Sequence, residues 1–474
     1  MTTSRAAHDL ADPPTRDAAV ERLVARHAGR PVVLGPGVLA GFTDAVARHR
    51  ARGSRVLVLS TTRGAGPVPD ADACEVVELA LAPADSVTDE LRQLDALAHD
   101  LPEEVVAAIE AFDPGHEAVW YPGNFVTTDE PLLGRELLGG RPRAFLALED
   151  KLLADEVWAA AGVPHAPYRI VPARLEDLTA ASDALAGQPG GLGTVWSGDA
   201  RDGFNGAGNY VRWVVDEADR AEAFAFFVPR CDRVRVMPFL DGVPCSIHGI
   251  VLPDGTAVFR PVEIASLRDP GRRRFLFGGL SSWWDPPAAD REEMRGHARR
   301  VGEHLRERHG YRGAFGIDGV LTADGFRPTE LNTRVSAGLT QLGKVAGELV
   351  QLVHDHLVAG HDTGLGYADV ESLLPLMDAQ RSGRAVAVGE GGSVGGSDEY
   401  AVAWDGRHLT RVEEPTGNRL VLGDTPSGFF AKIEPCAALG PGDRLGPLNA
   451  GLMRHLDATH GSSFGDAEAA PDLR

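Results

Sequence analysis

The stretch GIDGVLTADGFRPTELNTR (316–334) decides the fold of this chain. Its pattern predicts two strands joined by a tight turn, because the DG pair in its middle favours the backbone angles of a hairpin. Side chains alternate across a strand, so Glu330 and Asn332 are expected on one face, with Asp318 beside them on the partner strand. Arg334 continues the same face beyond the return strand.

These side chains have the chemistry of a magnesium site. Two carboxylates and one amide, from Asp318, Glu330 and Asn332, are the hard oxygen ligands that Mg²⁺ takes, with water and phosphate completing its octahedron. A planar guanidinium beside them, from Arg334, can contact a phosphate or a developing oxyanion. The alternative is a solvent-facing hairpin with ordinary polar residues. The apolar flanks and the position of Arg334 favour metal binding.

The lysines are a second signal. Only three of the 47 basic residues are lysines: Lys151, Lys344 and Lys432. Because arginine is the usual cation of this chain, each lysine is a candidate for a site that requires a compact ammonium group. Lys151 lies near the start of LEDKLLADEVWAAAG (148–162), a predicted helix whose N-terminus would favour an anion. The alternative for Lys151 is a solvated surface lysine.

A glycine-rich loop, ARDGFNGAGN (200–209), lies between two predicted strands within 188–214. Gly203, Gly206 and Gly208 would let backbone N–H groups approach phosphates and would let the loop close as a lid. A flexible linker is the alternative. The position between two strands favours the lid.

Together these features resemble the ATP-grasp superfamily of ligases. The resemblance rests on the spacing D-x11-E-x-N-x-R, on the DK pair upstream and on the order of elements, and it covers about 144–345 well. It implies that the oxygen ligands hold Mg²⁺ bridging the phosphates of ATP, that Lys151 reaches these phosphates, and that Arg334 contacts the transferred phosphoryl group. Narrower details, GTVWSGD and VMPFLDGVPCSIHG, are similar to peptide ligases of the pheganomycin biosynthesis type, which implies antibiotic biosynthesis.

The resemblance also assigns VRVMPFLDG (234–242) to the strand and hinge that bind adenine. Backbone groups around Met237, Phe239 and Leu240 would contact the base, and Asp241 is the candidate for the ribose contact. A plain core strand is the alternative.

One position departs from the family. A second lysine, expected near Trp196, is missing. Arg201 or Arg212 is a candidate substitute, and the mode of nucleotide binding is open at this point.

The acid substrate is expected at RPVEIASLRDPGRRRFLFGG (260–279), an arginine-rich stretch in an acidic protein. Arginine forks bind carboxylates in bidentate fashion, so Arg260, Arg268 and Arg274, with Glu263, are the predicted substrate-binding residues. A solvated basic loop is the alternative.

The pattern of elements divides the chain into three parts. Strands alternating with helices predict a parallel, Rossmann-like domain over 1–143. Residues 144–363 follow the order of an ATP-grasp domain of two α+β subdomains, and 364–474 are predicted to form a small C-terminal α/β domain. The predicted fold class is therefore α/β.

Composition excludes several classes of function. A net charge of -21 over 474 residues argues against nucleic-acid or anionic-membrane binding, since both require a cationic face. The sequence has neither a signal-peptide pattern nor an apolar run long enough to cross a bilayer, so a cytoplasmic protein is expected. A homodimer is left open.

The sequence therefore predicts a ligase that joins an acid and an amine, as small molecules or peptides, into an amide bond through an acyl phosphate, with release of ADP and phosphate. A nucleotide-binding sensor or scaffold without ligase activity is the alternative. The missing second lysine favours this alternative, and the intact hairpin set argues against it. An ATP-grasp phosphotransferase would require a phosphohistidine carrier domain, for which the sequence has no motif.

Overall fold

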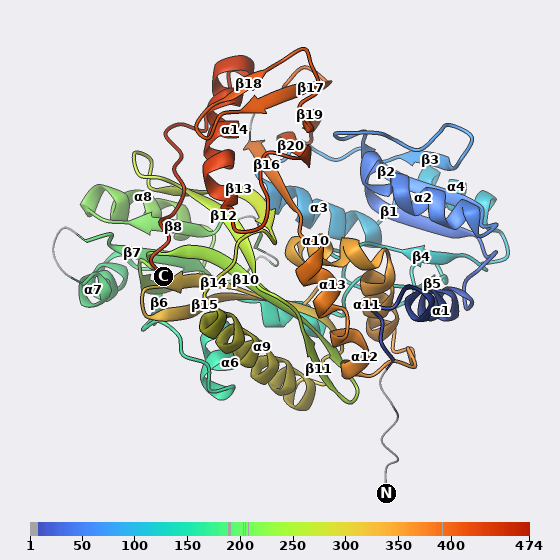
Figure 1. Ribbon diagram of the computed structural model, residues 1–474, viewed down its shortest axis with the longest axis horizontal. Helices are drawn as coiled ribbons and strands as arrows, with labels where there is room; N and C mark the ends of the chain where they lie inside the picture. The colour runs from blue at the N-terminus through green and yellow to red at the C-terminus, as the bar shows by residue number, and fades with distance from the viewer. Residues whose placement is uncertain (1–7, 188–190, 202, 204, 207, 391) are drawn as a thin grey trace, which may run out of the picture.

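The structure is a computed structural model that describes the whole chain except residues 1–7, 188–190, 202, 204, 207 and 391 (Figure 1). Three β-sheets organise the described residues: a parallel sheet near the N-terminus, a small antiparallel sheet and a large antiparallel sheet. They confirm the predicted α/β fold class.

The N-terminal sheet is parallel, as the alternation of strands and helices predicts. Its strands, in spatial order, are β3 (Glu75–Glu78), β2 (Val56–Thr62), β1 (Val32–Val38), β4 (Val119–Tyr121) and β5 (Glu136–Leu137). Helix α2 (Thr43–Ala51) packs on one face and α4 (Glu103–Phe112) on the other. Helix α3 (Val87–His99) lies between this sheet and the rest of the molecule (Figure 1).

The small sheet contains the strands that flank the glycine-rich loop. Its spatial order is β6 (Arg169–Pro172), β9 (Arg233–Pro238), β7 (Thr194–Gly198) and β8 (Val211–Val214). Helices α7 (Leu175–Leu185) and α8 (Glu217–Phe227) cover one face, where Trp196 and Phe227 are buried. Trp213 of β8 and Arg235 of β9 contact the large sheet, at Phe275 and at the Thr329 carbonyl.

The large sheet carries the predicted hairpin at its edge. In the described part of the chain it has eleven strands, one of which, β11 (Gly255–Val258), pairs only with β10. The others, in spatial order, are β15 (Gly325–Asn332), β14 (Gly313–Thr322), β10 (Val243–Leu252), β12 (Val262–Asp269), β13 (Arg274–Ser281), β16 (Gly383–Glu390), β20 (Gly428–Cys436), β19 (Asn418–Thr425), β17 (Ser397–Trp404) and β18 (Leu409–Arg411).

Helices cover both faces of this sheet. Helix α9 (Ala288–Arg308) packs on the face of Phe315 and Ile317, together with α6 (Ala154–Ala160). Helices α10 (Ala337–Gly343) and α11 (Leu349–Val358) pack on the opposite face, against Ala314 and Ile250. The short helices are α5 (Arg143–Leu146), α12 (Tyr367–Glu371) and α13 (Leu374–Ala379).

The C-terminal strands continue the large sheet instead of forming a sheet of their own, because β16 pairs with β13. Helix α14 (Leu445–His460) packs across β12, β13 and β16. At the other end of the chain, α1 (Pro13–Val24) packs against α11 and shares its core. The three predicted segments thus share cores, and the division at 143 and 363 stays a prediction.

Three predicted elements differ in detail. The predicted helix 148–162 is α-helical only over α6. A 3-10 helix (Ala147–Glu149) precedes it, and in the turn between them Asp150 accepts a hydrogen bond from the Leu152 backbone. The predicted helix near 338–358 is interrupted at Gly347, whose φ is 63°. The predicted strand 256–264 is two strands, β11 and β12, separated at Pro261, which cannot donate a ladder hydrogen bond.

Among the described residues, every helix is too short or too polar to cross a bilayer.

Candidate active site

The hairpin β14–β15 brings the predicted metal ligands together. Its register places Asp318 opposite Glu330, and Gly316 opposite Asn332. The Asn332 amide nitrogen donates a hydrogen bond to Asp318 Oδ2 at 3.0 Å. The register shifts directly after Asp318, which leaves Thr329 as an extra residue whose hydroxyl donates to the Asp318 carbonyl. This β-bulge twists the strand beside the two carboxylates.

The two carboxylates repel each other. Burial, and then the neighbouring Glu330 carboxylate, raise the pKa of Asp318 to about 6. Hydrogen bonds from Ser246 and Asn332 and the charge of Arg334 act in the opposite direction. A divalent cation between such carboxylates would relieve this repulsion. The donor set therefore fits Mg²⁺, provided that the Asn332 amide makes a half-turn and presents its oxygen instead of its nitrogen.

Ser246 and His248 hold Asp318 in place, and sequence reasoning missed both. Strand β10 pairs Ser246 with Asp318, and the serine hydroxyl donates to Asp318 Oδ1 at 2.6 Å. His248 Nε2 lies 3.1 Å from the same hydroxyl and must be the donor, since the serine proton goes to the carboxylate. Burial lowers the pKa of His248 to about 3, so the ring is neutral. The spacing of two residues between Ser246 and His248 in SIHG places both side chains on one face of the strand, and this pattern could have indicated them.

Lys151 contacts the cluster directly. Its Nζ lies 2.6 Å from Glu330 Oε2, although the residue belongs to the turn before α6 and not to the helix. Lys151 is 5% exposed, so the interpretation as a solvated surface lysine is wrong. The ion pair thus joins a buried ammonium to a partly exposed carboxylate.

Arg235 is a buried cation near the hairpin that sequence reasoning missed. It forms an ion pair with Asp155 of α6, with Nη2 and Oδ1 2.7 Å apart, and both residues are buried. Its Nη1 donates to the Thr329 carbonyl at 3.1 Å, next to Glu330. Arg235 therefore joins the small sheet, through β9, to the bulge of the hairpin.

Arg334 lies between the hairpin and the N-terminal domain. Its Nε is 3.5 Å from Glu149 Oε1, and its guanidinium carbon is 5.1 Å from the centre of the Phe125 ring. Glu149 Oε2 lies 2.9 Å from Arg141 Nη1, and Oε1 accepts a hydrogen bond from the Thr333 backbone. The guanidinium is thus held by a carboxylate and an aromatic face, close enough to Asp318 to lower its pKa.

The predicted adenine hinge joins β9 to β10. Met237 is buried in β9, while Phe239, Leu240 and Asp241 form the connection. The Phe239 ring lies 4.8 Å from that of Trp213 and 5.9 Å from that of Phe275. These three rings form an aromatic patch beside the hinge that sequence reasoning missed.

Asp241, the predicted ribose contact, is paired with Arg268. Arg268 Nη2 lies 2.6 Å from Asp241 Oδ1, and the Arg268 guanidinium lies over the Phe239 ring at 4.9 Å. Arg268 thus lies at the hinge rather than in a separate acid-binding site.

The glycine-rich loop contacts α3. Gly203, Gly206 and Gly208 are described, whereas Asp202, Phe204 and Ala207 of the predicted lid lie outside the described residues. The Thr88 hydroxyl donates to the Gly206 carbonyl at 2.9 Å, and Arg92 donates to Asn205 Oδ1 at 2.6 Å. In this structure the described part of the loop is docked on the N-terminal domain.

Tryptophan occupies the position of the missing second lysine, and both candidate arginines contact other groups. Trp196 is fully buried, and its indole nitrogen donates to the Ser182 hydroxyl at 2.8 Å. Arg212, its partner across the strands, lies over the Phe226 ring at 3.6 Å, and Arg201 pairs with Asp232 at 3.3 Å.

The four predicted acid-binding residues are not brought together. Arg260 is fully buried and pairs with Asp285 and Asp378, with N···O distances of 3.0 and 2.7 Å. Arg274 lies 3.2 Å from Asp269 and donates to two backbone carbonyls near the C-terminus. Arg260 precedes β12, whereas Arg268 and Arg274 are diagonal neighbours in the β12–β13 hairpin and point to opposite faces.

Glu263 receives the N-terminus of α14. Its carboxylate accepts hydrogen bonds from the backbone nitrogens of Leu445 and Gly446, at 2.7 and 3.2 Å, and from Arg444 Nε at 2.8 Å. The residue is fully buried. A carboxylate at the N-terminus of a helix satisfies unpaired N–H groups and interacts favourably with the helix dipole.

The other two lysines share one glutamate. Lys344 and Lys432 lie 2.8 and 2.9 Å from the two oxygens of Glu434, and Arg384 lies 3.7 Å from it. Burial alone would raise the pKa of Glu434, but hydrogen bonds from both lysines lower it to about 2. Three cations around one carboxylate leave an excess of positive charge, which suits an anionic group.

Comparisons with known proteins give likeness in structure only. No family model and no curated protein sequence matches the chain. An ADP complex of N5-carboxyaminoimidazole ribonucleotide synthetase is 14% identical, with a TM-score of 0.48 over 92% of this chain and 98% of the other. An L-amino acid ligase from Bacillus licheniformis is 14% identical, with a TM-score of 0.49 over 85% and 93%.

A third solved structure reaches a TM-score of 0.50. It is pyruvate carboxylase from Rhizobium etli, 15% identical, and the match covers 85% of this chain and 36% of the other. The likeness shows a mixed α/β fold. At these identities the likeness concerns the fold alone, so the reaction has to be argued from the site.

Proposed function

We propose that this protein is an ATP-dependent ligase that joins a carboxylate to an amine through an acyl phosphate and releases ADP and phosphate. The observation that carries the proposal is the hairpin cluster. Asp318 and Glu330 face each other across two strands, Asn332 donates to Asp318, and Lys151 lies 2.6 Å from Glu330. The cluster thus combines oxygen ligands for a metal ion with an ammonium group for the phosphates of a triphosphate.

Asp318, Glu330 and Asn332 would hold Mg²⁺. The bound ion would neutralise charge on the triphosphate and orient it. Ser246 and His248 keep the Asp318 oxygens fixed, so the site is arranged in advance.

For the nucleotide, we propose that Lys151 exchanges its contact with Glu330 for the phosphates once metal and ATP bind. The backbone of Gly203, Gly206 and Gly208 would cover the phosphates as a lid. The adenine ring would lie at the hinge around Met237, Phe239, Leu240 and Asp241. The aromatic patch of Trp213, Phe239 and Phe275 supports this placement, since aromatic faces stack on a base.

The reaction requires no nucleophile from the protein. A carboxylate oxygen of the acid attacks the γ-phosphorus, and ADP leaves. The amine nitrogen then attacks the carbonyl carbon, phosphate leaves, and the nitrogen loses a proton. Arg334 is the proposed donor to the oxyanion that forms at this carbonyl, because a guanidinium held by Glu149 and Phe125 is already oriented.

Amino acids or peptides are the proposed acid and amine, in a cytoplasmic enzyme of specialised metabolism. The support is the similarity of GTVWSGD and VMPFLDGVPCSIHG to peptide ligases. Of the predicted acid-binding residues, Arg268 lies beside the hinge, whereas Arg260, Glu263 and Arg274 are held in contacts of their own.

The test is product analysis with ATP, Mg²⁺ and mixtures of amino acids and peptides. We expect ADP and phosphate to form only when an acid and an amine are both present. AMP with pyrophosphate would exclude the acyl phosphate, and ATP binding without turnover on any mixture would support a sensor or scaffold instead. Glu330→Gln should abolish turnover, whereas the matched control Glu413→Gln, at an exposed turn, should leave it unchanged.

A further inference from the structure

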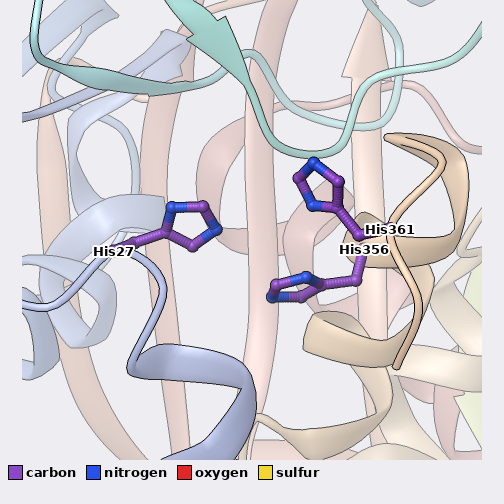
Figure 2. A group of neighbouring side chains, drawn as sticks. All are labelled: His27, His356 and His361. Carbon is purple, nitrogen blue, oxygen red and sulfur yellow. The ribbon is translucent and has the colours of Figure 1, made fainter. Parts of the chain in front are cut away.

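Three histidines meet where the N-terminal segment joins α11. His27 follows α1, His356 belongs to α11, and His361 lies just beyond α11. Each offers a ring nitrogen, and these nitrogens lie within 4.8 Å of one another. Figure 2 shows His27 approaching from one side and the other two from the opposite side. The ring centres are 5.4, 6.3 and 5.4 Å apart.

Two of the rings are buried, and four of the six ring nitrogens lack partners. His27 is 4% exposed and His356 is 2% exposed. Neither nitrogen of His27 has a hydrogen-bond partner, and the same holds for His356 Nε2 and His361 Nδ1. Buried polar groups are normally paired, so an unpaired group requires an explanation such as a bound ion.

The other nitrogens of His356 and His361 lie beside groups of the kind found behind metal-bound imidazoles. His356 is hydrogen-bonded to the backbone of Leu23, which leaves its Nε2 lone pair free. His361 Nε2 lies 3.7 Å from Glu136 Oε1, which leaves Nδ1 free. A carbonyl or a carboxylate on the far nitrogen is the usual arrangement behind a metal-bound imidazole.

The local charges are compatible with a cation. His27 and His356 are buried, and imidazole binds a metal ion in its neutral form. Arg26 and Arg30 lie nearby, and each is paired with Glu136, at 3.6 and 2.7 Å. The carboxylate therefore offsets part of the positive charge around the cluster.

We propose that His27, His356 and His361 bind one Zn²⁺ ion. Imidazole nitrogens suit zinc rather than magnesium, and three such ligands with water in the fourth position complete a tetrahedron. Zinc–nitrogen bonds of 2.0–2.1 Å place the nitrogens about 3.4 Å apart, so the rings must close slightly on the ion. The ion would tie the segment after α1 to α11, and the site shares no residue with the proposed ligase site.

The test uses the full chain, freed of metal with a chelator and titrated with Zn²⁺ against a chromophoric competitor. We expect one equivalent to bind. Glu136→Gln should weaken binding about 10- to 100-fold, and His361→Ala should weaken it further. The matched control is His304→Ala, because His304 is half-buried and faces only one other histidine, His309, at 5.5 Å between ring centres.

Co²⁺ provides a second readout. Bound in place of Zn²⁺, it should give the visible absorption bands of a tetrahedral site in the wild type and in His304→Ala. If His361→Ala fails to fold, the Glu136→Gln titration and the Co²⁺ spectrum of the wild type test the zinc site without it. No binding of one equivalent by the wild type, an octahedral Co²⁺ spectrum, or equal affinities of the wild type and Glu136→Gln would overturn the proposal.

Discussion

Replacing Glu263 by alanine distinguishes a structural role from the substrate role that the sequence suggested. The buried carboxylate accepts hydrogen bonds from Leu445, Gly446 and Arg444. Removing one partner of a buried ion pair costs about 3–5 kcal/mol, because the other charge and the N–H groups stay buried without a partner. We expect Glu263→Ala to destabilise the C-terminal part of the large sheet by this amount.

The assay combines thermal unfolding with amide hydrogen exchange. At about 2.1 cal/mol/K of unfolding entropy per residue, a loss of this size should lower the midpoint of the whole chain by about 3–5 °C. Exchange in α14 should accelerate before exchange in the parallel sheet, because α14 loses its N-terminal acceptor. Glu222→Ala, at an exposed position on α8, is the matched control. Unchanged stability and exchange, together with a raised KM for the acid substrate, would refute the structural role and restore Glu263 to the substrate site.

Two further predictions concern stability. Burial raises the pKa of Asp355 to about 7, above the ordinary value of 3.8. The contribution of Asp355 to the free energy of unfolding is therefore complete below about pH 4 and is lost as the pH rises through 7. Asp355→Asn should therefore stabilise the protein at pH 8 by up to about 4 kcal/mol and change little at pH 4, as thermal unfolding at both pH values can check. Gly278→Ala places a methyl group 1.8 Å from Asn449 Nδ2 and 2.8 Å from the Ala265 carbonyl, so chemical denaturation should show a loss of about 1–3 kcal/mol; an unchanged midpoint contradicts this packing.

The hairpin could be predicted because its information is local. Alternation along β15 and the DG turn place Glu330 and Asn332 on one face, and Asp318 follows from the pairing. Ser246 could not be found in the same way, because its contact with Asp318 spans 72 residues and depends on which strand lies beside β14. The order of strands in a sheet is a tertiary property that the hydrophobic pattern of one strand does not contain.

The basic stretch 260–279 shows where prediction from composition fails. Composition suggested a cluster, but a β-hairpin distributes successive side chains over two faces. Arg260 pairs with Asp378 from a distant segment, and Arg274 pairs with the nearby Asp269. The three histidines likewise come together only through the packing of α1 on α11. Contacts between distant segments were therefore the part that sequence could not provide.

The most direct test of the magnesium–ATP site is the position of Mn²⁺ in crystals grown with Mn²⁺ and a non-hydrolysable ATP analogue, located by anomalous scattering. We expect a peak about 2.1 Å from carboxylate oxygens of both Asp318 and Glu330, with phosphate oxygens on its other side and Lys151 turned to the phosphates. An analogue bound elsewhere, with Asn332 still donating to Asp318 and Lys151 still paired with Glu330, would contradict the proposed site.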